Sequence, residues 1–247
     1  MITYFEMPGR FGNIILSIYT VFKYCQIHKI DFNKIIFSKN GLCNKTFFSK
    51  EVYPFLTKIY NYNFMDHKVY LEALKSCIKI RSSYEFIGDD NICFIGYKWL
   101  YPTEKDINSM LLWAKLFYNP EYFTEAVKNT VPQELDISKC TAIHIRRTDF
   151  VNLCSKYVLK IDRINLSIDK SENPCIIFSD DIEWCEENIK NNKVIYFVKN
   201  KDTAQSWATM SMCKNIVQNP YSTYSLTARY TNTYIYKYLK YQNNLTN

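Results

Sequence analysis

The spacing of apolar residues changes several times along the chain, and each change predicts a new element. Residues 2–6 alternate apolar and polar side chains as a strand does, and apolar residues after Asn13 then recur on one face at helical spacing. Residues 140–145 and 175–179 are short apolar runs of strand length, which suits strands buried in a parallel sheet. Strands that alternate with helices in this order are typical of α/β proteins.

The remaining pattern predicts further elements on both sides of a proline. Strands are predicted near residues 34–37, 92–96, 194–198 and 215–218. Helices are predicted from about residue 104, over 120–130, 158–170 and 203–213, and at the C-terminus over 231–241, where the helix packs back on the body. Val131 and Pro132 interrupt the pattern, because a proline biases the residue before it away from the helical conformation. We therefore predict two domains, residues 1–132 and residues 133–247.

The composition is that of an ordinary folded protein. At 247 residues with 47% apolar content, the chain is long enough for one large or two small domains. The formal net charge of +7 is spread thinly along the sequence, without a run of basic residues. The positive charge favours anionic ligands or surfaces, and the absence of a basic run argues against a nucleic-acid tail.

Cysteine and histidine usage bears on the compartment and on metals. The nine cysteines occur singly, and Cys140, Cys175 and Cys213 lie in apolar runs, so we expect reduced core thiols and a cytoplasmic protein. The three histidines do not combine with cysteines at zinc-ligand spacing, so no metal is expected. The uncharged run over residues 11–22 falls short of the roughly 20 residues that cross a bilayer, so we expect no membrane span. Peripheral membrane contact of the C-terminal helix is a minor alternative.

Two adjacent arginines follow the apolar run at residues 140–145. In open parallel sheets ligands bind outside the carboxyl ends of the strands, where Arg146 and Arg147 are expected to lie. The planar guanidinium group matches two phosphate oxygens at once. We therefore expect an anionic ligand here, and a solvated pair of surface arginines is the alternative from these residues alone.

The residues around the arginines resemble a known motif. His144, Arg146, Arg147 and Asp149 stand in the His-x-Arg-Arg-x-Asp order that is typical of GDP-fucose-dependent glycosyltransferases. The chain resembles the α1,2-fucosyltransferases of glycosyltransferase family 11. The stretch FSDDIEWCEENI from Phe178 is similar to the Phe-Ser-Asp-Asp run of that family, and MSMCKNIV and PYSTYSLTARY further on resemble two more of its segments.

A turn with two glycines after the first strand adds to this resemblance. The segment GRFGN, residues 9–13, resembles the first loop of protein O-fucosyltransferases. Gly9, Gly12 and Asn13 also fit the corresponding loop of family 11, where Arg10 replaces the second glycine. Such a turn can offer backbone N–H groups to an anion, and a simple tight turn is the alternative. The resemblance implies that Arg10 helps to hold the departing diphosphate. Ile14 stands where both families usually have glutamine.

Asp180 and Asp181 follow the second apolar run, at residues 175–179. Guanine presents N1–H and an amino group side by side, and one carboxylate accepts hydrogen bonds from both. We expect one aspartate to select guanine over adenine and the other to cap the helix that begins near Ile182. The sequence leaves open which aspartate has which role.

Three hydroxyl side chains, Ser222, Thr223 and Ser225, follow the last predicted strand of the sheet and match positions of family 11. Hydroxyls at a turn between a strand and a helix can donate to phosphate or can cap the helix, and both roles can hold at once. Tyr221 stands where the family has asparagine. This departure concerns the sugar contacts more than the nucleotide site.

The resemblance implies an α/β fold of GT-B type, with two Rossmann-like domains that face each other across a cleft. Residues 1–132 would form the acceptor-side domain, and residues 133–247 would bind the GDP-sugar. The implied reaction transfers L-fucose from GDP-fucose to a glycan acceptor, at a galactose hydroxyl in α1,2 linkage, with inversion. Neither a metal nor another cofactor is implied, because fixed arginines would stabilise the leaving diphosphate.

The motifs also imply roles for individual residues. Arg10, Arg147 and Asp149 would be catalytic; Asp149 is the nearest candidate for the base that deprotonates the acceptor, and orienting the arginines is its alternative role. The residues expected to bind the donor are Gly9, Gly12, Asn13, His144, Arg146, Arg147, Asp180, Asp181, Ser222, Thr223 and Ser225.

Three alternatives to this function stay open. The same fold would serve another GDP-sugar or a protein acceptor. An inactive relative would retain only the nucleotide site. A nucleotide- or nucleic-acid-binding module that uses the tyrosine-rich, basic surface is the alternative from another class, and the lack of a basic cluster argues against it.

Overall fold

The computed structural model has a mixed α/β architecture. It describes residues 3–5, 10–38, 52–60, 62–65, 69, 72, 75, 78–80, 92–94, 100–103, 106–153 and 155–245. The chain divides into two compact units. The N-terminal unit comprises Met1–Asn119 together with Tyr234–Asn247, and the C-terminal unit comprises Pro120–Thr233.

The division lies at Pro120 rather than at the Pro132 boundary that the sequence suggests. Helix α6 (Pro120–Thr130) explains the difference, since it packs along α10 (Thr203–Met212) of the C-terminal unit. The rings of Phe123 and Trp207 meet edge to face between these helices, with centroids 6.0 Å apart. The break at Pro132 therefore ends a helix inside the C-terminal unit.

A parallel sheet forms the centre of the N-terminal unit, in the order β3-β2-β1-β5-β4. Its strands are β1 (Thr3–Phe5), β2 (Ile35–Ser38), β3 (Asn63–Met65), β4 (Ile78–Ile80) and β5 (Ile92–Phe94). The strands predicted at residues 2–6, 34–37 and 92–96 are confirmed. The sequence analysis does not predict β3 and β4, each of which is three residues long.

Helix α1 (Phe11–Ile27) is buried along most of its length, as its apolar spacing predicts. Phe22 near its centre lies 6.3 Å from the ring of Phe37 in β2 and 5.8 Å from the ring of Tyr62, measured between centroids. Its described residues also form η1 (Phe32–Lys34), α3 (Tyr53–Ile59) and α5 (Ile107–Phe117). Aromatic packing thus builds the core of the N-terminal unit.

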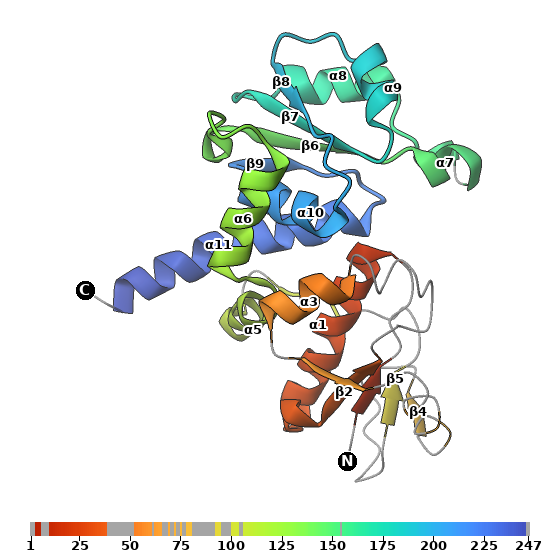
Figure 1. Cartoon of the computed structure of the whole chain (residues 1–247), viewed down its shortest axis with the longest axis vertical. Helices are drawn as coiled ribbons and strands as arrows, with labels where there is room; N and C mark the ends of the chain where they lie inside the picture. Colours follow the sequence, from red (N-terminus) through yellow and green to blue (C-terminus); the bar gives the residue numbers. More distant parts are fainter. Residues whose placement is uncertain are drawn as a thin grey trace. The chain divides into compact units, whose positions relative to one another are not determined.

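A second parallel sheet, in the order β8-β7-β6-β9, forms the centre of the C-terminal unit. Its strands fall on the predicted runs: β6 (Thr141–Ile145), β7 (Cys175–Ser179), β8 (Val194–Phe197) and β9 (Asn215–Val217). Besides α6 and α10, this part contains η3 (Ile137–Lys139), α7 (Thr148–Leu153), η4 (Ser155–Tyr157), α8 (Ile161–Asp169), α9 (Ile182–Asn188) and the first part of α11 (Thr223–Leu245). Figure 1 shows α8 and α9 on one face of the sheet and α6 and α10 on the other.

Burial on both faces explains why β6 and β7 are uninterrupted apolar runs. Ile143 and Ile145 of β6 pack against Ile164 and Ile168 of α8 and against Cys185 of α9, and all five side chains are buried. Burying one isoleucine contributes about 1.5–3 kcal/mol. This cluster holds β6 and β7 against the two helices, and it therefore fixes the direction in which the carboxyl ends of both strands point.

Helix α11 begins at Thr223 and not near residue 231, where the sequence predicts its start. The buried positions of its first turns are small or polar, and two of their hydroxyls donate to carbonyls of the same helix. Thr227 donates to the carbonyl of Thr223 and Thr231 donates to the carbonyl of Thr227, both at 2.9 Å. The apolar spacing therefore becomes visible only further along the helix. Its residues from Tyr234 onward belong to the N-terminal unit.

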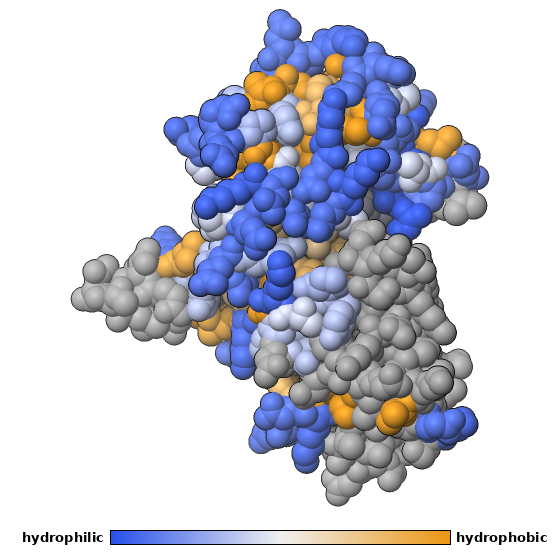
Figure 2. Space-filling view, in the orientation of Figure 1, coloured by the Kyte–Doolittle hydropathy of each residue, from blue (hydrophilic) through white to orange (hydrophobic). Residues whose placement is uncertain are grey.

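The visible face of the C-terminal unit is mainly hydrophilic, with apolar residues in small groups (Figure 2). Cys25, Cys140, Cys175, Cys185 and Cys213 are buried free thiols, which confirms the predicted burial of the three in apolar runs. Among the described helices, none combines the length and hydrophobicity needed to cross a membrane.

Candidate functional site

The carboxyl ends of β6 and β7 lie side by side at one edge of the C-terminal sheet. The two strands pair in parallel, with His144 opposite Phe178 and Ile145 opposite Ser179. The residues that follow the strands therefore emerge at the same edge. The structure thus brings the predicted arginine pair and the predicted aspartate pair together, although more than thirty residues separate them in the sequence.

Asp180 connects the two strand ends through both oxygens of its carboxylate. Its Oδ1 accepts a hydrogen bond of 2.8 Å from the backbone N–H of Arg147. Its Oδ2 accepts from the hydroxyl of Thr148 and pairs with Nη1 of Arg146 at 3.1 Å. The carboxylate is 20% exposed, so these contacts are partly shielded from water. Asp180 therefore holds the segment that follows β6 in place.

Arg146 lies between two carboxylates. Besides its contact with Asp180, its Nη2 lies 2.8 Å from Oδ1 of Asp149 in the first turn of α7, and its guanidinium lies 5.9 Å from the ring centre of Phe150. Its side chain is only 15% exposed. A guanidinium held this way is preorganised, because its direction is set before any ligand arrives.

Arg147 is held by contacts of a different kind. Its guanidinium carbon lies 3.5 Å from the ring centre of Trp184, and its Nε donates to Oδ2 of Asp181 at 3.2 Å. Asp181 occupies the N-cap position of α9, but its side chain makes no capping hydrogen bond. The expectation that one aspartate caps this helix is therefore wrong, because each is engaged by an arginine instead.

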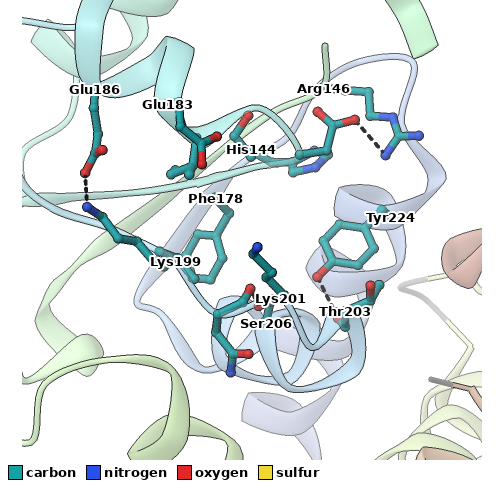
Figure 3. A pocket seen from close by; sticks show the side chains of 15 residues that line it. His144, Arg146, Phe178, Glu183, Glu186, Lys199, Lys201, Thr203, Ser206 and Tyr224 are labelled. Atoms are coloured by element: carbon teal, nitrogen blue, oxygen red, sulfur yellow. Dashed lines mark hydrogen bonds and ion pairs between the residues drawn. The ribbon is translucent and has the colours of Figure 1, made fainter. Parts of the chain in front are cut away.

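A pocket of about 630 Å³ opens beside these strand ends (Figure 3). Of the residues predicted for the site, His144, Arg146 and Asp180 line it, whereas Arg147 and Asp181 do not. The full lining consists of His144, Arg146, Phe178, Ser179, Asp180, Ile182, Glu183, Glu186, Val198, Lys199, Asn200, Lys201, Thr203, Ser206 and Tyr224. All of these residues belong to the C-terminal unit.

His144 lines the pocket from a buried position on β6. Burial lowers the pKa of its imidazole from 6.5 to about 4, and the neighbouring Asp180 carboxylate only partly opposes this shift. Its ring lies 5.2 Å from that of Tyr224, whose hydroxyl donates to the carbonyl of Thr203. Its Nδ1 makes no hydrogen bond to any described residue. At neutral pH the imidazole is therefore uncharged, and its Nδ1 is buried.

Of the three predicted hydroxyls, Ser222 lies in the turn between β9 and α11, and Thr223 and Ser225 lie in the first turn of α11; all three are outside the pocket lining. Ser225 is fully buried, and its Oγ accepts the backbone N–H of Asn219 at 3.1 Å. Ser222 is 8% exposed and directly precedes the helix, and Thr223 is its first residue. Ser225 thus stabilises the backbone of the turn that precedes α11.

The first-loop residues belong to the N-terminal unit. Gly9 lies outside the described residues. Arg10 is exposed at the N-cap position of α1, and its carbonyl accepts the backbone N–H of Ile14 at 3.1 Å. Gly12 is buried and Asn13 is half-buried in the first turn of α1.

Several residues that line the pocket are not predicted from the sequence. Lys199 and Lys201 follow β8, and Glu183 and Glu186 lie on α9. The rule that ligands bind at the carboxyl ends of parallel strands points to the two lysines once β8 is recognised as a strand. No comparable signal marks Tyr224, which is one of many tyrosines in the chain. Within the described residues, no three His, Cys, Asp or Glu side chains are grouped so as to hold a metal ion.

Comparison with known proteins adds independent findings. Residues 123–243 match the model of Glycosyl transferase family 11. The O-antigen biosynthesis glycosyltransferase WbnK of Escherichia coli is 36% identical over 107 residues, which cover 38% of this chain and 35% of that protein. The chain thus matches only about a third of the length of this curated relative.

Solved structures show the same fold at low sequence identity. Fucosyltransferase NodZ from Bradyrhizobium superposes with a TM-score of 0.59 and 12% identity, over 93% of this chain and 92% of that chain. POFUT1 in complex with GDP-fucose superposes with a TM-score of 0.50 and 12% identity, over 93% of both chains. These findings confirm the predicted α/β fold of GT-B type and the resemblance to family 11, and they support a glycosyltransferase.

Proposed function

We propose that this protein is an inverting glycosyltransferase that transfers L-fucose from GDP-fucose to a hydroxyl of a glycan acceptor, a galactose in α1,2 linkage. The observation that carries the proposal is the preorganised guanidinium of Arg146 on the wall of a 630 Å³ pocket. A pocket of this size suits a nucleotide-sized ligand. The match to family 11 and the GDP-fucose bound to POFUT1 support the choice of donor.

Arg146 is the residue we assign to the donor diphosphate. Its terminal nitrogens lie between the carboxylates of Asp149 and Asp180, and diphosphate oxygens would compete for the same donors. The lining also carries Lys199 and Lys201, which follow β8. We also propose Arg10 and Arg147 as catalytic groups. Arg147 would act through the N–H groups that its contact with Asp181 leaves available.

The reaction explains why fixed positive charge matters. The bond between the anomeric carbon of fucose and the diphosphate oxygen breaks, and both electrons go to that oxygen. The acceptor oxygen bonds to the opposite face of the carbon, and its proton passes to water. Because the sugar becomes oxocarbenium-like while the diphosphate gains charge, preorganised cations stabilise the transition state more than the ground state.

Asp149 is better suited to orient Arg146 than to accept the acceptor proton. Its carboxylate oxygen lies 2.8 Å from the guanidinium. Asp149 is also absent from the pocket lining, so its carboxylate is directed to the arginine and not to the pocket. We therefore assign Asp149 a positioning role, and this assignment changes its expected role as the base.

Incubation with GDP-fucose and a β-galactoside such as lactose, in EDTA, tests the proposal. The expected product is a fucosylated disaccharide, identified by mass spectrometry and by its anomeric NMR signals, and formed equally fast with and without EDTA. GDP-mannose and UDP-galactose serve as competing donors. Transfer from another donor in preference to GDP-fucose would refute the donor assignment, and a rate that collapses in EDTA would refute metal independence.

A further inference from the structure

The charges of the pocket are balanced in number, and two of the acidic side chains, Asp180 and Glu186, form ion pairs with Arg146 and Lys199. Arg146, Lys199 and Lys201 contribute positive charge, and Asp180, Glu183 and Glu186 contribute negative charge. Figure 3 shows Arg146 on one side of the pocket, with Glu183, Glu186 and Lys199 away from it towards α9. A nucleoside diphosphate has its charge at one end and its base at the other. With the diphosphate at Arg146, the base would extend towards α9.

The carboxylates of this pocket differ in what they already bind. Both oxygens of Asp180 are engaged by Arg146, by Thr148 and by a backbone N–H. Glu186 forms an ion pair of 2.8 Å with Lys199, which raises the pKa of that lysine. Glu183 accepts no hydrogen bond from any described residue, and it lies on the first turn of α9. Among the described residues, Glu183 is therefore the lining carboxylate with both oxygens available to a ligand.

We infer that Glu183 is the residue that selects guanine, an inference that rests on the proposed function. Guanine N1–H and its amino group are adjacent donors, and the two oxygens of one carboxylate accept both. The neighbouring O6 of guanine is an acceptor, which suits the ammonium of Lys199. Adenine presents an acceptor at N1 and a donor at N6. The carboxylate of Glu183 would therefore repel N1, and the ammonium of Lys199 would repel the amino group. Glu183 replaces Asp180 and Asp181 in the role that the sequence suggests for them.

The surroundings of Glu183 suit a base as well as its edge. Phe178, Ile182 and Val198 give the pocket an apolar wall. Figure 3 shows the ring of Phe178 in the same part of the pocket as Glu183 and Lys199. Apolar side chains can pack against the flat faces of a base, while charged groups form hydrogen bonds with its edge.

Isothermal titration with GDP, inosine diphosphate and ADP tests the inference. Inosine diphosphate lacks only the amino group of guanine, so the affinity ratio of the two ligands reports on that contact. The wild-type protein is expected to prefer GDP by about 10-fold or more, since a hydrogen bond to a charged group is worth at least that factor. Glu183→Gln should weaken GDP binding by about 10–100-fold and bring the ratio to about 2 or less.

Glu187→Gln is the matched control, because Glu187 is an exposed residue of α9 outside the pocket lining. It should keep the wild-type ratio. The ratio is taken within each variant, so a general loss of folded protein does not imitate the effect. The inference is overturned if Glu183→Gln keeps the wild-type preference, or if Asp181→Asn removes it instead. Failure of the wild-type protein to bind GDP would refute the proposed function and this inference with it.

Discussion

The Asp180 carboxylate and the Arg146 guanidinium form an ion pair of 3.1 Å that joins the segments following β7 and β6. The same carboxylate binds the backbone of the next residue, so one side chain sets the direction of an arginine and the path of its loop. A ligand that meets Arg146 therefore meets a group whose orientation is already fixed.

Asp180→Asn should lower the free energy of unfolding by about 1–3 kcal/mol, because it removes a charged acceptor from three donors at a partly shielded position. Urea denaturation measures this change. Glu172→Gln, an exposed position of the same unit, is the control and should change stability by less than about 0.5 kcal/mol. Equal effects of both substitutions would contradict the role given to Asp180.

The contact between Arg147 and Trp184 predicts a coupling that lysine cannot reproduce. Lysine lacks the planar group that lies 3.5 Å from the indole ring. A double-mutant cycle of Arg147→Lys and Trp184→Leu should give a coupling free energy of about 0.5–2 kcal/mol. A coupling near zero would show that the two side chains contribute independently.

His144 predicts a pH dependence of stability. Its pKa is lowered from 6.5 to about 4 in the folded protein, so the unfolded chain binds the proton more readily between these values. The contribution of His144 to the free energy of unfolding is therefore fully present above pH 6.5, and it decreases as the pH falls towards 4. Between pH 7 and pH 5 the loss should be about 1–2 kcal/mol in urea titrations. In His144→Gln this part of the pH slope should vanish, and an unchanged slope would contradict the assignment.

Thr227 accepts the indole N–H of the buried Trp207 at 3.0 Å. Thr227→Val keeps the shape of the side chain but leaves this donor without an acceptor, so it should destabilise the protein by about 1–3 kcal/mol. Thr124→Val is a matched control on an exposed position of α6, where the hydroxyl bonds only its own helix. Thermal unfolding of both variants compares the two sites, and similar melting temperatures would refute the prediction.

The sequence predicts the edge at which the site lies, since apolar runs mark β6 and β7 and the charged residues follow directly. It does not predict the pairing at that edge. Asp180 and Asp181 are chemically identical, and only strand register and twist decide that Asp180 meets Arg146 while Asp181 meets Arg147. The identity of the unoccupied carboxylate, Glu183, follows from that pairing and is invisible in the sequence.

The predicted division at Pro132 shows a second limit. A proline reports where a helix ends, whereas unit membership depends on what the helix packs against. Here α6 packs on α10 through Phe123 and Trp207, which lie far apart in the sequence. Contacts between residues so far apart in the sequence produce no recognisable pattern in either segment.

Titration calorimetry in EDTA with GDP, UDP and ADP, on the wild-type protein and on Arg146→Ala, tests the central claim most directly. Arg163→Ala, an exposed arginine of α8, serves as the control. We predict that GDP binds at least about 10-fold tighter than UDP or ADP, and that Arg146→Ala weakens GDP binding by about 10–100-fold while the control does not. Equal affinity for the three nucleotides, or wild-type affinity in Arg146→Ala, would contradict the assignment of this pocket as the GDP-sugar site.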